Sequence, residues 1–192
     1  PQGVQKMASG ALSALTFIIS SIAQLYLLVL LLRLFMPWMG ATYQNPIAQA
    51  ILKLTSPLVV PVRRILPPVG KLDTATLVVA FGIQYLTILV IAVIHRATPG
   101  IMPIAVTAAV NLIVLAINLF VFAIIIRVVL SWISPGAYNP ATAIIGALTE
   151  PVLRPFSRLI PPLGGMDLSP VFAIIILSAA GIFVSSFRML PV

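Results

Sequence analysis

Long runs without any charged residue alternate along the chain with stretches that carry nearly all of its charges. The charge-free runs cover residues 8–32, 75–94, 97–126 and 168–187. Each run is long enough to cross the hydrocarbon core of a bilayer, which takes roughly 20 helical residues. The pattern therefore predicts an all-α membrane protein with four transmembrane helices.

The first run follows Lys6 and could be mistaken for a signal peptide. Its apolar stretch is far longer than the roughly 7–15 residues of a signal sequence, and no small-x-small cleavage pattern follows it. We expect this segment to be retained as a span.

An internal repeat relates the two halves of the chain at a constant offset, without a gap. The matched residues are Arg33/Arg127, Trp38/Trp132, Asn45/Asn139, Pro46/Pro140, Leu54/Leu148, Thr55/Thr149, Pro57/Pro151, Pro61/Pro155, Arg64/Arg158, Pro67/Pro161, Pro68/Pro162, Gly70/Gly164 and Asp73/Asp167. Each copy consists of a span, a long connector and a span. The predicted units are residues 1–96 and 97–192, two tandem parallel repeats about a pseudo-twofold axis along the membrane normal.

Basic residues predict the orientation of these spans. The two long connectors, residues 33–73 and 127–167, hold eight of the 11 Lys and Arg residues, whereas Lys6, Arg96 and Arg188 lie on the opposite side. Because cytoplasmic loops carry the excess of Lys and Arg, the connectors are expected in the cytoplasm and both termini on the far side.

Each long connector is expected to contain a helical elbow at the membrane surface or re-entering it. Asn45-Pro46 and Asn139-Pro140 predict helix starts, since Asn caps free N–H groups and Pro suits the first helical position. Short helices are expected over residues 47–54 and 141–148. The other expected features are helix stops at Pro57 and Pro151, extended exits at Pro67-Pro68 and Pro161-Pro162, and turns at Gly70 and Gly164.

Charged and aromatic residues of the elbows are the candidate functional residues. Arg63, Arg64, Arg154 and Arg158 are expected to face anionic headgroups or a protein partner. Trp38 and Trp132 suit the aromatic belt of the interface. Two interpretations stay open for the acids at the entry of the second and fourth spans. Each forms a structural clasp with an arginine, Arg33 with Asp73 and Arg127 with Asp167, or each only caps its helix.

Polar residues form stripes on the spans, at Ser13, Thr16, Ser20 and Gln24, at Thr76, Gln84 and Thr87, at Asn111 and Asn118, and at Ser178, Gly181 and Ser185. Such stripes usually let membrane helices approach closely and hydrogen-bond to one another. A narrow polar pathway would give the same pattern, and we favour helix contact over a pathway.

Composition excludes several classes of function. Apolar residues make up 61% of the chain and charged residues 7%, too few charges for a soluble domain. With no cysteine and one histidine, His95, neither a disulfide nor a metal site is expected, and no cofactor. The three acids, Asp73, Glu150 and Asp167, lie outside the spans, which disfavours an ion-coupled carrier. No nucleophile–base set can be assembled, so we expect no catalysis, and the net charge of +8 suits anionic lipid rather than nucleic acid.

The connector motifs resemble those of the YggT (YlmG-like) membrane proteins of bacteria and plastids. The resemblance rests on Arg33-x4-Trp38, Asn45-Pro46, Thr55-x-Pro57, Pro61-x2-Arg64-x2-Pro67 and Gly70-x2-Asp73, with Gly164-Gly165-Met166-Asp167-Leu168-Ser169-Pro170 closing the second copy. It covers nearly the whole chain, in the two-repeat form of proteobacterial members. In the first copy, Lys71 and Thr74-Ala75-Thr76 depart from the Gly-x-Asp-x-Ser-Pro pattern.

This resemblance implies a multi-pass protein of the bacterial inner membrane. In that membrane, the distribution of basic residues predicts long connectors in the cytoplasm and both termini in the periplasm. The resemblance implies no assigned reaction, but associations with osmotic or ion stress, cell division, plastid nucleoid organisation and cofactor assembly in cytochrome b6 complexes. We therefore expect a non-catalytic scaffold or assembly factor that acts through its basic elbows, with a membrane-protein partner or as a homo-oligomer. The alternative is a channel or an osmolyte- or ion-permeation protein linked to osmotic stress.

Overall fold

The computed structural model describes the chain apart from residues 1, 40–43, 134–135, 137–138, 160–166 and 191–192. Its described residues form helices joined by turns and loops. The helices are α1 (Gln2–Met39), α2 (Pro46–Arg63), α3 (Thr74–Ile94), α4 (Ile101–Ile133), α5 (Pro140–Leu159) and α6 (Ser169–Ser185). The predicted all-α class is thus confirmed for these residues.

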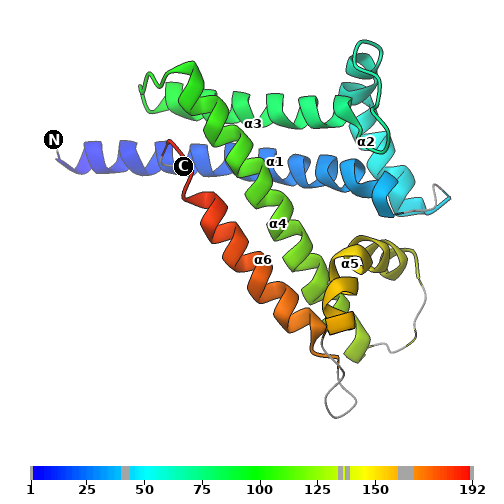
Figure 1. Cartoon of the computed structure of the whole chain (residues 1–192). Coiled ribbons are helices and arrows are strands. Elements are labelled where there is room, and N and C mark those ends of the chain that lie inside the picture. Colours follow the sequence, from blue (N-terminus) through cyan, green and yellow to red (C-terminus); the bar gives the residue numbers. More distant parts are fainter. Residues whose placement is uncertain (1, 40–43, 134–135, 137–138, 160–166, 191–192) are drawn as a thin grey trace.

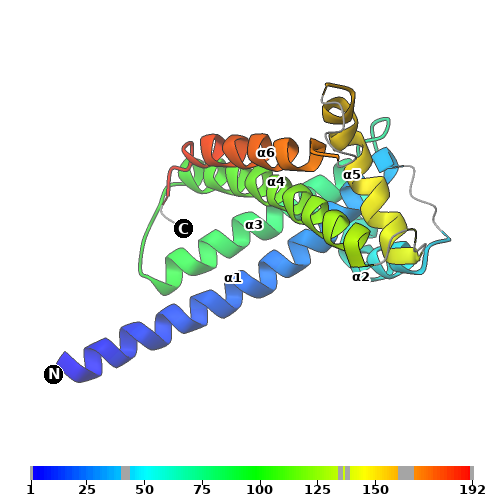
Figure 2. The same ribbon diagram turned by 90° about the horizontal axis from the view of Figure 1, so that it is seen from below.

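The strongly apolar helices lie in two pairs, α1 beside α3 and α4 beside α6 (Figures 1 and 2). The remaining helices, α2 and α5, lie together at one end of these pairs, and we call them the elbow helices and this end the elbow end. The chain termini and the short link between α3 and α4 lie at the opposite end, which we call the terminal end (Figure 2).

Three of the helices are long and apolar enough to cross a membrane. They are Gly10–Trp38 within α1, Thr74–Ile94 and Ile101–Ile133. Helix α6 is apolar too but shorter, at 17 residues. The long apolar helices indicate a membrane protein, as the charge-free runs predict.

Two of the helices extend beyond the runs that predict them. Helix α1 continues through Arg33 to Met39, and α4 continues through Arg127 to Ile133. Arginine is a good helix former, so a charge does not end a helix when its side chain finds partners. Both arginines find them on the elbow helices, as described below.

The predicted helix stops at Pro57 and Pro151 are wrong. Helix α2 runs through Pro57 and Pro61 to Arg63, and α5 runs through Pro151 and Pro155 to Leu159. A proline inside a helix removes one backbone hydrogen bond and crowds the preceding turn. Burial offsets this cost, because α2 packs one face with Ala48, Ile51, Thr55 and Val59, and α5 packs the matching face with Ile144, Leu148, Thr149 and Leu153.

The predicted helix starts are confirmed. The Asn45 side-chain oxygen accepts a hydrogen bond from the Ile47 amide, and that of Asn139 accepts from the Ala141 amide, each at 2.9 Å. The Asn45 side-chain amide also donates to the Pro140 carbonyl oxygen at 2.8 Å. This bond ties the start of α2 to the start of α5.

The turn expected at Gly70 is confirmed by its backbone φ of 61°, which glycine adopts without strain. Its counterpart Gly164 and the pair Pro161-Pro162 lie outside the described residues.

An apolar layer fills the space between the first three spans and α2. Leu27, Leu30, Val59, Ala80 and Leu112 are buried in one cluster with Ala75. It lies on the elbow side of the middle of α1 and α3. On both helices, polar residues such as Gln24 and Gln84 lie on the terminal side of this layer.

Helix α3 ends at Ile94, and Arg96, two residues later, adopts a backbone conformation that usually selects glycine. Arg96 has φ of 55°, the Ala97 amide donates to the Ala92 carbonyl and the Arg96 amide donates to the Val93 carbonyl. These two bonds define a Schellman motif, in which the left-handed residue is most often Gly. A side chain in this conformation costs roughly 1–2 kcal/mol.

Arg96→Gly is therefore expected to stabilise the protein. Relief of the strained φ exceeds the extra entropy that glycine has in the unfolded chain, so the gain should be about 0.5–1 kcal/mol. Thermal unfolding in detergent measures it, with Arg96→Ala as the control that removes the charge and keeps the strain. Equal stabilities for the Gly and Ala variants would contradict the strain argument.

Candidate functional site

A buried charge network at the elbow end joins three elements of the first repeat. Arg33 of α1 is only 4% exposed. One of its terminal nitrogens donates to the Thr55 hydroxyl of α2 at 2.7 Å, and its Nε lies 3.7 Å from the Asp73 carboxylate before α3. The structure thus brings together the first pair of residues considered as a clasp.

Asp73 has a second cationic partner and a capping role. Arg63, at the last turn of α2, donates a hydrogen bond to the Asp73 carboxylate. Both the Thr76 hydroxyl, at 2.7 Å, and the Thr76 amide, at 3.4 Å, donate to the same carboxylate and so cap α3. The two interpretations of Asp73, ion pair and cap, therefore hold at once.

The pKa of Asp73 lies below its usual value. Burial alone would raise this pKa, but the hydrogen bond from Thr76 and the positive charge of Arg63 outweigh it. The carboxylate is thus ionised at neutral pH and supplies the counter-charge for Arg33 and Arg63.

In the second repeat, the corresponding arginine, Arg127, is neutralised by a different acid. Arg127 donates to the Thr149 hydroxyl at 2.9 Å, as Arg33 does to Thr55, but its ion pair is with Glu150 of α5, at 3.0 Å. Asp167 caps the start of α6 by accepting from the Ser169 amide at 2.9 Å. Contrary to the clasp expected from sequence, the described residues give Arg127 and Asp167 separate partners.

Two substitutions between the copies explain this difference. Glu150 stands where the first repeat has Ser56, which places an acid beside Arg127 on the elbow helix itself. Ser157 stands where the first repeat has Arg63, so the second copy has no arginine there to draw the aspartate inward. The Glu150 side chain is 61% exposed, and exposed pairs contribute little to stability.

The partner threonines are functional residues that sequence reasoning missed. Thr55 and Thr149 each accept from an arginine and donate to a carbonyl one turn back in their own helix, Ile51 and Ile145. Both are fully buried. Their recurrence at matched positions of the repeat was the available signal.

The arginines expected to face headgroups separate into two kinds. Arg63 is committed to Asp73, whereas Arg64, Arg154 and Arg158 are exposed and have no ion-pair partner within the described part of the chain. Trp38 and Trp132 are 57% and 78% exposed near the ends of α1 and α4, at the elbow end. Exposed apolar side chains accompany them, among them Leu54, Leu58 and Leu159.

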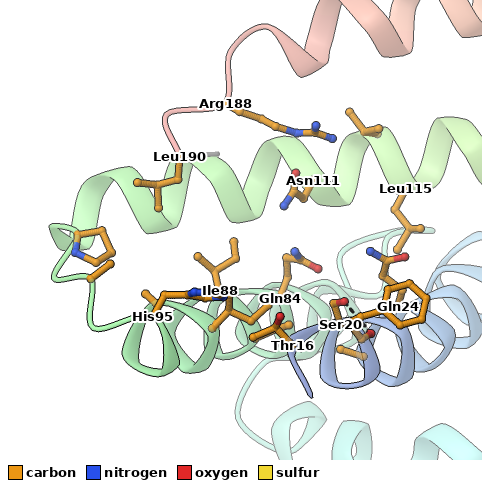
Figure 3. Close-up of a pocket in the computed structure, with 18 of the residues that line it drawn as sticks. Thr16, Ser20, Gln24, Gln84, Ile88, His95, Asn111, Leu115, Arg188 and Leu190 are labelled. Carbon is orange, nitrogen blue, oxygen red and sulfur yellow. Dashed lines mark hydrogen bonds between the residues drawn. The ribbon is translucent and has the colours of Figure 1, made fainter. Parts of the chain in front are cut away.

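Polar residues of three spans line one cavity toward the terminal end (Figure 3). The contributors are Ser13, Thr16, Ser20 and Gln24 from α1, Gln84 and Thr87 from α3, and Asn111 and Asn118 from α4. Thr76 belongs instead to the Asp73 network. Of the stripe on α6, Ser178 is exposed, Ser185 is half-buried and Gly181 is buried, against Ile117.

The site has none of the groupings that metal chemistry requires. Among the described residues, no three His, Cys, Asp or Glu side chains lie together as a metal ion would need. Its charged groups instead hold helices in place, and its polar groups line a cavity.

These features define a class, a helical membrane protein with a charged clasp beneath its spans and a polar cavity between them. The family model described as CCB3/YggT matches residues 12–94 and again residues 106–188. The chain belongs to this family, as its connector motifs indicate.

Proteins of similar sequence agree with this assignment. The chain is 40% identical over 170 residues to an uncharacterized protein of Pseudomonas aeruginosa, covering 88% of this chain and 86% of that protein. It is 33% identical over 167 residues to the YggT protein of Escherichia coli K12, covering 86% of each. A chloroplast YlmG homolog of Arabidopsis thaliana is 38% identical over 78 residues, 39% of this chain and 28% of that protein. No solved structure matches the chain.

Proposed function

We propose that the protein is a non-catalytic scaffold of the inner membrane, which acts through a rigid basic platform formed by its elbow helices. The observation that carries this proposal is the charge network around Arg33, Thr55 and Asp73. A buried ion pair adds little net stability over an apolar core, but it holds its elements in one arrangement. A rigidly held elbow suits a protein that presents a binding surface to other proteins.

The exposed side of the platform has the chemistry of a headgroup-level surface. Arg64, Arg154 and Arg158 supply unpaired positive charge, and Leu58 and Leu159 supply apolar area beside them. Such a combination suits the boundary between anionic headgroups and acyl chains. The proposed binding partner of the platform is another membrane protein, or a second copy of this chain, that lies at the same boundary.

In this proposal α6 is the fourth span, and the elbow helices lie on the cytoplasmic side. The excess of Lys and Arg at the elbow end supports this orientation. A reporter fused after Val192 should then be periplasmic, and a tag inserted at Gly136 should be cytoplasmic. Protease accessibility in intact cells and in inverted vesicles measures both. A cytoplasmic reporter at Val192 together with a cytoplasmic tag at Gly136 would mean that α6 does not span.

The scaffold role is tested with a photo-crosslinking residue at Leu58 on α2 and at Leu159 on α5, in living cells. Discrete protein adducts are expected at both positions. The matched control is Phe122 on α4, which is equally apolar and 67% exposed but lies on a span, where lipid adducts are expected. Lipid adducts alone at all positions would reduce the elbows to membrane anchors and refute the scaffold.

The exposed arginines should set lipid preference. Arg154→Gln with Arg158→Gln is expected to lower the enrichment of co-purifying phosphatidylglycerol by about fivefold per charge, from roughly 1 kcal/mol for each cation near the surface. Quantitative lipid mass spectrometry measures this, with Arg96→Gln at the terminal end as the control. If lipid enrichment is unchanged and the elbow crosslinks disappear, these arginines bind protein rather than lipid.

The second candidate function is permeation, favoured by the polar cavity. On α1 and α3, the buried residues Leu27, Leu30 and Ala80 of the apolar layer lie on the elbow side of the residues that line this cavity. Permeation therefore requires a second conformation in which this layer parts. Solute or ion flux in liposomes that is abolished by bulkier side chains at Ala80 would support permeation over the scaffold.

A further inference from the structure

The cavity between the two halves is large and has a mixed lining. Its volume is about 930 Å³, near the upper end of the roughly 300–1,000 Å³ of typical ligand pockets. Side chains of α1, α3 and α4 form its walls, and residues of the α3–α4 link and of the C-terminal segment line its terminal end. The C-terminal segment is fixed there, because the Met189 amide donates to the buried Thr107 hydroxyl and Leu190 packs on Ile88 and Ile104.

Four carboxamide side chains face this cavity without protein partners. Gln84 is only 7% exposed and Asn111 is half-buried, whereas Gln24 and Asn118 are exposed, and within the described chain none of the four forms a side-chain hydrogen bond. Figure 3 shows Gln84 and Asn111 projecting toward one another from α3 and α4. Burying one such amide without a partner costs about 1–3 kcal/mol, and hydrocarbon offers none. The cavity therefore holds water or a molecule that makes several hydrogen bonds.

The charge of the lining has one sign. Arg188, on the C-terminal segment, and His95, at the end of α3, are its ionisable residues, and no acid contributes to it. The three acids of the chain, Asp73, Glu150 and Asp167, belong to the elbow end. No ion pair involves Arg188 in the described residues. A cleft with charge of one sign and low-dielectric walls concentrates ligands of the opposite sign.

We propose that this cavity is a binding site for an organic oxyanion, a phosphate or carboxylate that also carries hydroxyl or amide groups. Arg188 takes the anionic group, and the carboxamides of Gln84 and Asn111 take the neutral polar groups. Phe17, Ile88 and Leu115 contact the carbon skeleton. The oxyanion is either a free solute or the headgroup of a lipid, since both present the same chemistry. The site lies at the opposite end of the protein from the elbows and does not depend on the scaffold role.

The test exploits the absence of cysteine from the chain. Asn111→Cys places one thiol in the cavity, and Ile113→Cys, on the same helix and 50% exposed outside it, is the matched control. Both variants are placed in nanodiscs of phosphatidylcholine and labelled with anionic sulfonatoethyl or cationic trimethylammonioethyl methanethiosulfonate. Each rate is divided by that reagent's rate with a small free thiol. Thr87→Cys repeats the measurement if Asn111→Cys does not fold.

The cavity thiol should react with both reagents, and about tenfold faster with the anionic one after normalisation. Arg188→Gln should bring the two normalised rates to within about twofold, while the control thiol should react slowly with both. A cavity thiol as unreactive as the control would mean that acyl chains or a second copy of the chain fill the space, and would overturn the proposal. Equal normalised rates before the Arg188→Gln change would overturn it as well.

Two probes then distinguish the sources of the oxyanion. Millimolar glycerol 3-phosphate that slows labelling of the cavity thiol at least threefold, and does so only with Arg188 present, assigns the site to a free solute. Slowing by phosphatidylglycerol in the nanodisc, with the same dependence on Arg188, assigns it to a lipid headgroup. If neither probe slows labelling, the space is a water-filled vestibule and the binding site is refuted.

Discussion

Asp73→Ala is expected to lower the free energy of unfolding by about 3–5 kcal/mol, because it leaves Arg33 buried without a counter-charge. It also removes the cap of α3 and releases Arg63. Unfolding in mixed micelles measures the loss. The matched control is Asp167→Ala, which removes only an exposed cap and should cost about 1 kcal/mol.

A double variant separates the charge from the cap. Asp73→Ala with Arg33→Leu removes the buried cation together with its partner, so it should be more stable than Asp73→Ala alone. Equal losses for Asp73→Ala and Asp167→Ala would mean that capping accounts for both aspartates. The network around Arg33 would then no longer support a fixed elbow.

Leu27→Ala is expected to cost about 2–5 kcal/mol, the second large effect. Leu27 is fully buried in the apolar layer, where truncation leaves a hole that neighbours fill only partly. Leu25, two residues earlier on α1, is 65% exposed and supplies the control. Its truncation should change stability by less than about 0.5 kcal/mol, since lipid or detergent fills the space.

The same pair of variants reports on the layer's second role. If the layer seals the cavity, Leu27→Ala should also let small solutes leak from liposomes, and Leu25→Ala should not. A large loss of stability with no leak would leave Leu27 as a packing residue only. Comparable losses for both variants would contradict the position of the layer.

The helices were predictable from sequence because hydrocarbon imposes a simple rule on them. A run such as 75–94, free of charges and about 20 residues long, has few alternatives to a membrane helix, and α3 occupies Thr74–Ile94. The same rule fails at Arg33, where it ends the span too early. A charge is excluded from lipid, not from protein, and the burial of Arg33 against Thr55 depends on residues distant in sequence.

The helix stop predicted at Pro57 failed for a related reason. Local helix propensity includes the cost of the hydrogen bond that a proline removes. It does not include the stabilisation that α2 gains when Thr55 and Val59 are buried against other helices. The ion pair of Arg127 could not be predicted from the repeat, because Glu150 has a serine, Ser56, as its counterpart in the first copy.

Sequence periodicity could not predict whether the polar stripes pack against other helices or line a cavity. The spacing of Gln84 and Thr87 places both residues on one face of a helix, but it does not show which other helix that face contacts. Closely packed helices and a lined cavity share the same spacing. Only the arrangement of α1, α3 and α4 distinguishes them, and it places these residues around a cavity.

The two clasps make the halves of the chain non-interchangeable despite their shared motifs. A protein built from two first copies would carry Arg63 and Asp73 twice, with a serine in place of Glu150. One built from two second copies would carry Glu150 and Ser157 twice, and so would have no arginine at either position that corresponds to Arg63. Each half therefore neutralises its connector arginine with an acid of its own, placed before the following helix in the first half and on the elbow helix in the second.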